Sequence, residues 1–304
     1  MMIKILGFLV LGTSALYITQ SQVHAGPERD ALLVKYNTVS PKLTNNHFGL
    51  PIALESSERN RVLKGEVIGV INHDMNDTRQ SLLQPAQWCN LLILHLNTKA
   101  CTYESGPNPV LHWYSGKKEY RTPKQATKFS LTFNVVKNEA DYLSVRLFSE
   151  NGPIGISDSL IELEATDLPP ELYAETSGRR TLIRLVYSYQ SSIPSELATR
   201  FYLATLARNK VGFTVLDNTN NQPKYIQGKQ GIIERNTIRY FLAILTRLEF
   251  RSSQHDMADQ FEHWFEQTER YHRQLYEIPK EQYMAAKKKE LINQRNEQAK
   301  IIIR

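Results

Sequence analysis

An alternation of apolar and polar residues between Phe129 and Val135 places the strongest constraint on how this chain can fold. Every second position there is phenylalanine, leucine or valine, and serine, threonine or asparagine stands between them. Because successive side chains of a strand point to opposite faces, this pattern predicts a strand with one buried face. Similar segments follow at Tyr142–Ser149, Ile156–Ala165 and Arg180–Tyr189. Several strands joined by short polar loops predict an antiparallel meander rather than parallel crossovers.

One strand and two short helices are expected ahead of this meander. Leu63–Asn72 is rich in β-branched residues, which favours a strand. Asp77–Leu83 has helical spacing and stops before Pro85, which predicts a short helix. Periodicity alone does not assign the apolar run Gln87–Asn97, and we favour a helix there.

The chain has two cysteines, Cys89 and Cys101. Bridged Cα atoms lie within about 7 Å of each other, so a disulfide between them requires the intervening chain to double back. A helix within Gln87–Asn97 would return Cys101 toward Cys89. In an exported protein we expect this disulfide, and the alternative is a pair of buried, unpaired thiols.

After Ser191 the spacing of apolar residues becomes helical. Ser195–Val211 begins after a proline and places its apolar residues near one face, which predicts a helix. Glu234–Phe250 also favours a helix, although Ile238–Leu245 could instead form a strand. A long helix is expected from about Asp256 to Ile278, with a last basic helix after it.

The N-terminus has the order of a secretory signal peptide. Lys4 precedes an apolar run from Ile5 to Ile18, and small residues surround a cut between Ala25 and Gly26. A membrane span needs about 20 apolar residues, and this run falls short of that length. We therefore expect a periplasmic or secreted protein, and an N-terminal membrane anchor is the alternative.

We divide the chain into four parts. Residues 1–25 are the signal peptide, and 26–60 read as a loop-rich N-terminal segment with one short strand at Gly49–Glu55. Residues 61–216 hold the α+β domain, and 217–304 form a helical C-terminal region.

The positive charge is concentrated at the C-terminus. The chain carries a formal charge of +6, and Met284–Arg304 holds six basic residues against two acidic ones. Because the excess lies in one terminal segment and export is expected, we do not predict nucleic-acid binding. Lys287–Lys289 and Ile301–Ile303 could give the basic C-terminus a peripheral contact with an anionic membrane, and the alternative is a solvated, fraying helix.

The order of elements resembles the START-like helix-grip superfamily. The passage from Val67 through Asp77 to Trp88 is similar to its opening strand and first helices, and Ser195–Val211 looks like its long gripping helix. The resemblance covers about half of the chain, from Leu63 to Val211. It implies an α+β fold in which an antiparallel sheet wraps around a long helix.

A narrower resemblance rests on short motifs. Gln84–Cys89, the cysteine pair, Phe148–Pro153 and Glu234–Tyr240 look like a group of uncharacterised exported proteobacterial proteins. That group brings no known activity with it, and fold alone does not transfer function.

The helix-grip resemblance implies a cavity for an apolar ligand, often a lipid, sterol or aromatic molecule. The candidate lining residues are Phe133, Val145, Tyr187, Tyr189 and, on the helix, Arg208. The alternative is that these residues pack a closed core.

No catalytic, metal-binding or cofactor motif is present, so neither metal nor cofactor is expected. His95 stands within a leucine-rich run, where a histidine usually belongs to the core. Arg235 and Arg239 would lie one helical turn apart and could bind a carboxylate or phosphate, unless they form a solvated face.

Three functions remain open at this level. The first is binding of an apolar small molecule or lipid in the cavity, as a non-enzymatic carrier or sensor. The second is a cyclase-type or hydratase-type enzyme in the same cavity, with His95, Arg146 or a carboxylate converging there. The third is an envelope interaction protein that docks an unknown protein partner through its C-terminal helices.

Overall fold

The structure is a computed structural model, and it describes residues 26–153, 155–172, 178–192, 210–217, 223–251 and 256–302. The expected signal peptide, residues 1–25, lies outside the described residues. The same holds for residues 193–209, which contain nearly all of the expected helix Ser195–Val211 and the candidate ligand residue Arg208.

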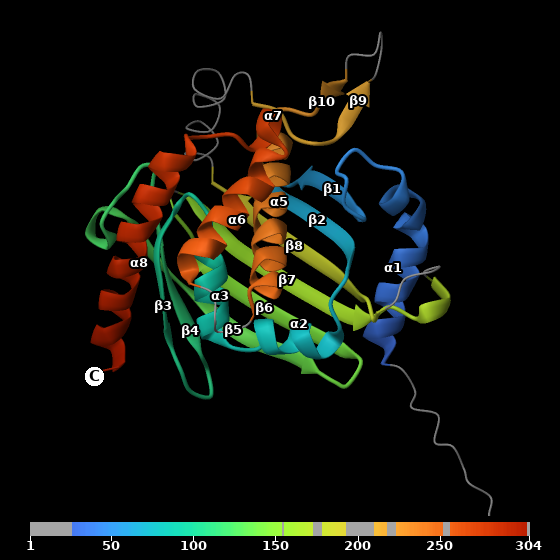
Figure 1. The fold of residues 1–304 in the computed structure, drawn as a ribbon, viewed down its shortest axis with the longest axis horizontal. Coiled ribbons are helices and arrows are strands. Elements are labelled where there is room, and N and C mark those ends of the chain that lie inside the picture. The colour runs from blue at the N-terminus through green and yellow to red at the C-terminus, as the bar shows by residue number, and fades with distance from the viewer. Residues whose placement is uncertain are drawn as a thin grey trace, which may run out of the picture.

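Eight antiparallel strands form one sheet, in the order β1-β2-β8-β7-β6-β5-β4-β3 (Figure 1). The strands are β1 (Ile52–Arg59), β2 (Val62–Ile71), β3 (Thr98–Glu104), β4 (Val110–Ser115), β5 (Thr127–Asn138), β6 (Tyr142–Asn151), β7 (Ile156–Asp167) and β8 (Thr181–Ser191). From β3 to β8 each strand pairs with the next one in the chain, which confirms the expected meander.

The alternation of apolar and polar residues predicted for Phe129–Val135 is visible in β5. Phe129, Leu131 and Phe133 are buried, and the residues between them are exposed. Val135, which the pattern assigns to the buried face, is 40% exposed. The pairing of β5 with β6 shifts register between Val135 and Lys137, so the alternation loses its phase there.

A long helix, α5 (Gly228–Glu249), packs on one face of the sheet, which we call the inner face (Figure 1). It contacts β1, β2 and β8, and its Phe241, Ile238 and Ile244 belong to the main buried cluster. Ile238–Leu245 is therefore helical, and the alternative of a strand is wrong. The α+β fold, with an antiparallel sheet and a long helix packed on it, is confirmed. The long helix described on the sheet is α5, which belongs to the segment expected as a separate C-terminal region, whereas nearly all of the expected helix Ser195–Val211 lies outside the described residues.

Two short helices connect β2 to β3. In α2 (Met75–Leu82) the Asp74 side chain caps the N-terminus by accepting a hydrogen bond from the Asp77 amide at 2.8 Å. The next helix, α3 (Pro85–Leu92), starts with a proline at its first position. It ends five residues earlier than the expected Gln87–Asn97 helix, and the chain then turns back into β3.

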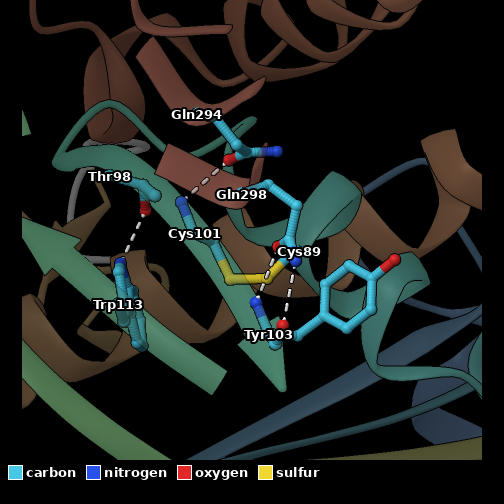
Figure 2. The surroundings of a disulfide bond; sticks show 7 residues. All are labelled: Cys89, Thr98, Cys101, Tyr103, Trp113, Gln294 and Gln298. Atoms are coloured by element: carbon cyan, nitrogen blue, oxygen red, sulfur yellow. Dashed lines mark hydrogen bonds between the residues drawn. A yellow bond between two sulfur atoms is a disulfide. The ribbon is translucent and has the colours of Figure 1, made fainter. Parts of the chain in front are cut away.

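This return brings Cys101 of β3 to Cys89 of α3, and the two form the expected disulfide (Figure 2). Their Cα atoms are 5.0 Å apart. The prediction of a bridged loop that doubles back is confirmed.

The N-terminal segment differs from the expectation of a loop-rich stretch. Pro27–Thr44 forms helix α1, with a proline in its first turn, and its Leu32, Tyr36, Val39 and Leu43 are buried. These four residues recur at helical spacing and pack on the outer face of the sheet, opposite to α5. The next element is strand β1, which begins within the expected short strand Gly49–Glu55 and runs on to Arg59.

Neighbouring strand residues show that α1 and α5 lie on opposite faces. Ile52 and Val67 pack in the cluster with α5, and Ala53 and Ile68 pack in the cluster with α1. Because adjacent strand residues point to opposite faces, the sheet is covered on both sides in this region.

The expected helix from Asp256 to Ile278 is interrupted at Arg270 and Tyr271, which separates α6 (Met257–Glu269) from α7 (His272–Leu275). The last helix, α8 (Lys280–Ile302), runs beside edge strand β3 (Figure 1). The short elements are β9 (Val215–Asp217), β10 (Lys224–Tyr225) and the 3-10 turns η1 (Pro123–Gln125) and η2 (Pro170–Leu172). None of the helices described is long and apolar enough to cross a bilayer.

Candidate ligand-binding cavity

A cavity of about 160 Å³ lies between the inner face of the sheet and α5. Strand residues that point inward form one wall: Trp113 and Ser115 of β4, Phe129 and Leu131 of β5, Ile156, Ser159 and Ile161 of β7, and Tyr187 of β8. Asn236 and Tyr240 of α5 form the opposite wall, and His95, Asn97 and Pro153 come from loops.

Sequence spacing explains how these residues meet. Phe129 and Leu131 are two apart on a strand and therefore share a face, and Asn236 and Tyr240 are four apart on a helix and lie one turn from each other. The turn after α3 then places His95 over Tyr240, where the two rings stack with their centroids 5.1 Å apart.

Aromatic rings dominate the lining. The Tyr240 ring meets Tyr187 edge to face at 5.0 Å and Trp113 at 6.1 Å, and Trp113 contacts Phe129 at 5.2 Å. The Trp113 indole nitrogen donates a hydrogen bond to the Thr98 hydroxyl at 2.9 Å (Figure 2). This bond satisfies the polar end of Trp113 and leaves its ring as an apolar wall.

His95 is one of several polar residues in this largely aromatic lining, and it is only 4% exposed. Its Nδ1 accepts a hydrogen bond from the Asn97 amide at 3.2 Å, so the proton of the neutral ring sits on Nε2. Nε2 is buried and forms no close hydrogen bond within the described residues, although the Asn236 side chain lies near enough to the ring to oppose the lowering of its pKa by a hydrogen bond. His95 is therefore a neutral polar residue in the wall of the cavity.

The titratable groups of the cavity are held in their neutral forms. Burial lowers the pKa of His95 well below its usual value, and the positive charges of Arg239 and Lys287 lower it further. Burial likewise raises the pKa values of Tyr187 and Tyr240 above the ordinary tyrosine value. No charged side chain of the described residues lines the cavity, so it suits an uncharged, apolar group with a hydrogen-bond acceptor.

The candidate ligand residues from the sequence fall into three groups. Tyr187 lines the cavity, and Tyr189 packs against it with ring centroids 5.7 Å apart but does not line the cavity. Phe133 and Val145 are buried in the packed core of the sheet and are not part of the lining. Arg208 lies outside the described residues.

Sequence reasoning missed Trp113, Asn236 and Tyr240. The spacing of Asn236 and Tyr240 on a predicted helix was the available signal, but that helix was not identified as the one on the sheet. The sequence predicts His95 as a core residue, and the structure buries it in the wall of the cavity.

The polar residues of the central strands lie away from the cavity, on the outer face. Arg146 pairs with Glu162 at 2.6 Å, and Arg184 pairs with Glu66 at 3.0 Å and with Glu164. Burial raises the pKa of Glu66, but hydrogen bonds from Arg184, Lys35 and Lys64 outweigh this effect and lower it overall. These are cross-strand ion pairs, so Arg146 and the carboxylates do not converge with His95. Among the residues described, no group of histidines, cysteines and carboxylates is arranged to hold a metal ion.

Comparisons with known proteins give little guidance. No protein-family model and no curated protein matches the sequence, so the narrower resemblance to exported proteobacterial proteins has no support. The similar solved structures include a conserved protein of unknown function from Enterococcus faecalis, with 10% identity, TM-score 0.30, and coverage of 71% of this chain and 91% of that one.

Two further similar structures are known. Human StAR-related lipid transfer protein 5 has 11% identity, TM-score 0.29, and coverage of 60% of this chain and 90% of that one. A protein from Arthrobacter aurescens has 9% identity, TM-score 0.29, and coverage of 67% and 98%. Likenesses of this strength do not indicate a function.

Proposed function

We propose that this protein binds an apolar small molecule, or the apolar part of a lipid, in the cavity under α5. The observation that carries the proposal is the aromatic-lined cavity itself, with the neutral His95 ring in its wall beside Tyr240. A guest with a carbonyl or hydroxyl oxygen could accept a hydrogen bond from His95, and its apolar part would fill the space.

The cavity volume limits the guest. An engineered cavity of about 150 Å³ in another protein holds benzene, and the cavity here has about 160 Å³. One ring or a short acyl segment therefore fits inside. A longer ligand would have to continue out of the cavity.

Two ligands of nearly equal shape test the role of His95. Acetophenone carries a carbonyl where ethylbenzene carries a methylene group, so only acetophenone can accept the Nε2–H bond. We expect calorimetry to show about tenfold tighter binding of acetophenone, which corresponds to one neutral hydrogen bond. His95→Phe keeps the ring stack and should abolish this preference.

The matched control is His272→Phe, because His272 is 63% exposed and lies outside the cavity. This variant should bind both ligands like the parent protein. The proposal fails if neither ligand binds the parent protein, or if the preference for acetophenone persists in His95→Phe. If both ligands bind as expected, native mass spectrometry of the protein isolated from its own cells should identify the natural guest.

We propose further that the protein works after export. The N-terminal charge and apolar pattern support this, as does the Cys89–Cys101 disulfide, which an oxidising compartment favours. Cell fractionation followed by mass determination should find a mature chain starting at Gly26 in the periplasm or medium. A full-length chain retained in the cytoplasm would contradict export.

An enzyme of the cyclase or hydratase type is the second candidate, favoured by a neutral His95 stacked on Tyr240, whose ring in turn meets Tyr187, since these groups could polarise a carbonyl. Binding is preferred because no carboxylate of the described residues lines the cavity to act as a base. Docking through the C-terminal helices has weaker support, since Trp264 and Tyr283 of these helices are buried in the main core.

A further inference from the structure

Strand β1 is one edge of the large sheet, and its pairing with β2 shows which of its backbone groups point away from the sheet (Figure 1). The Val70 N–H donates to the Pro51 carbonyl at 3.0 Å, and the same register continues along β1. Successive residues of an antiparallel edge strand direct their N–H and C=O groups alternately toward the neighbouring strand and away from it. The odd-numbered residues of β1 therefore face β2, and Leu54, Ser56 and Glu58 face outward.

The outward side of β1 is occupied only at its start. There the Asn46 side chain donates a hydrogen bond to the Ile52 carbonyl at 3.2 Å. Within the described residues, no hydrogen bond reaches the backbone N–H or C=O groups of Leu54, Ser56 and Glu58 from this side. An edge with unpaired backbone groups is a template for the addition of another strand.

The side chains beside this open edge carry charges of both signs. Glu55, Ser57 and Arg59 share one face of β1 and are all exposed. The Glu55 carboxylate also lies 3.1 Å from the Lys42 ammonium, but both of these side chains are more than half exposed. Glu55 therefore remains accessible to a cation from a second molecule.

A second copy of the chain supplies such a cation in the right place. Two identical edge strands pair antiparallel when a two-fold axis relates the copies. With Ser57 opposite its own counterpart, Ser56 and Glu58 of the second copy exchange backbone hydrogen bonds. In the same register Glu55 lies directly opposite Arg59 of the second copy, and the symmetry repeats this contact. Opposite charges at directly facing positions stabilise a strand pair.

The neighbouring registers are less favourable. Shifting the second strand by two positions places Glu55 opposite Glu55 of the second copy, so like charges face each other. With Ser56 opposite its own counterpart, the turn at Asn60 of the second copy would lie opposite Ile52, where the Asn46 side chain already occupies the edge.

We propose that the protein forms a two-fold symmetric homodimer by antiparallel pairing of its β1 edges, in the register that sets Glu55 against Arg59. The sheet then continues from one copy into the other. The interface is a single strand from each copy, so the dimer is weak and depends on protein concentration. This inference is independent of the cavity and of what the cavity binds.

Charge reversal tests the proposed register. We expect sedimentation at low salt, from about 1 μM to about 1 mM protein, to show a monomer–dimer equilibrium that weakens as salt is added. Glu55→Arg and Arg59→Glu each place like charges opposite one another at both symmetric contacts. Each variant alone should therefore raise the dissociation constant of the dimer by at least about tenfold.

Mixing the two variants makes the test specific. In an equimolar mixture, one chain carries only positive charges at positions 55 and 59 and the other only negative charges, so unlike chains should pair again with about the affinity of the parent protein. The controls are Glu150→Arg and Lys124→Glu, which make the same reversals at exposed positions outside β1 and should leave the dissociation constant unchanged.

A backbone variant provides a second measurement. Glu58→Pro removes an outward N–H group that forms no backbone hydrogen bond within the described residues, and proline is tolerated on edge strands. We expect the variant to keep the circular dichroism of the parent protein and to lose the dimer.

Three results would overturn the inference: a monomer at every concentration, a dimer that persists in both single charge variants, or a mixture that stays monomeric. None of them affects the cavity function, because binding of acetophenone is measured separately and does not require the dimer.

Discussion

The side-chain amide of Gln298 hydrogen-bonds both backbone groups of Tyr103: its oxygen accepts from the Tyr103 N–H at 2.9 Å, and its nitrogen donates to the Tyr103 carbonyl at 3.0 Å (Figure 2). One turn earlier on α8, the Gln294 oxygen accepts from the Cys101 N–H at 2.8 Å. Tyr103 and Cys101 lie on β3, which is the edge of the sheet. The helix thus supplies the hydrogen bonds that another strand would otherwise provide, and it protects an edge that could pair with a second chain.

Removing these amides should expose the edge. Gln294→Ala leaves the buried Cys101 N–H without a partner, so we expect a loss of about 1–3 kcal/mol in the free energy of unfolding. Gln298→Ala should cost less, because Tyr103 is only partly buried. Urea denaturation measures both, with Asn296→Ala at an exposed position of the same helix as the control. Equal stabilities of all three variants would contradict the role given to α8.

A second prediction concerns three charges buried where α8 meets the turn before β3. The Glu290 carboxylate lies 2.8 Å from the Lys99 ammonium and 2.9 Å from the Lys287 ammonium, and all three side chains are buried. Lys287 also donates to the His95 and Thr98 carbonyls. Glu290→Gln would leave two buried ammonium groups without a counter-charge. We expect a loss of about 3–5 kcal/mol, measured by urea denaturation.

The control for this variant is Glu297→Gln on the same helix. Glu297 pairs with Lys300, which is largely exposed, so its loss should change stability by less than about 1 kcal/mol. A similar effect of both variants would show that the buried charges do not form a stabilising unit.

The same helix shows where sequence reasoning reached its limit. Lys287, Lys288 and Lys289 look alike in the sequence and were considered together as a solvated or membrane-facing run. The structure buries Lys287 and exposes the other two. Lys287 differs from its two neighbours because it pairs with Glu290 and donates to the His95 and Thr98 carbonyls, which lie nearly 200 positions earlier in the chain. A local sequence pattern does not contain that information. Any contact with an anionic membrane would have to use Lys288, Lys289 and the residues beyond them.

Most of the sheet could be predicted, because the period of two is a local property of each strand. Helix α1 was missed although its four buried residues recur at helical spacing, because polar residues separate them and Pro41, a residue that usually ends or kinks a helix, lies within it. Tyr187 was a candidate because of the helix-grip resemblance, but the cavity also needs Tyr240 and His95. Only the packing of α5 against the sheet brings these three residues together. One lining residue could therefore be predicted from the sequence, whereas the complete cavity could not.

The pH dependence of stability should report on His95. Its pKa is lowered well below the usual value by burial and by Arg239 and Lys287, so between that value and about 6.5 the unfolded chain binds one more proton than the folded one. His95 therefore costs no stability above about pH 6.5, and it lowers stability increasingly as the pH falls below that value. His47 and His73, whose pKa values burial also lowers, act in the same direction.

The variant His95→Phe isolates the contribution of this one residue. Below pH 6.5, urea denaturation should give a slope of stability against pH that is smaller than that of the parent protein by up to about 1.4 kcal/mol per pH unit. Parallel curves for the two proteins between pH 6.5 and 5 would mean that His95 does not resist protonation.

The last prediction concerns the closeness of α5 to the sheet, on which the cavity depends. A Cβ atom added at Gly65 of β2 would collide with the Thr237 hydroxyl of α5, and its distance from the Thr237 Cβ would be only 3.1 Å. We expect Gly65→Ala to cost about 1–3 kcal/mol of unfolding free energy, because the helix must move outward. In a Thr237→Ala background the hydroxyl is absent, so the added cost of Gly65→Ala should be smaller there, and a double-mutant cycle measures the difference. An outward shift would also enlarge the cavity and weaken binding of acetophenone. Additive costs in the cycle would mean that the sheet and the helix do not meet at this pair of residues.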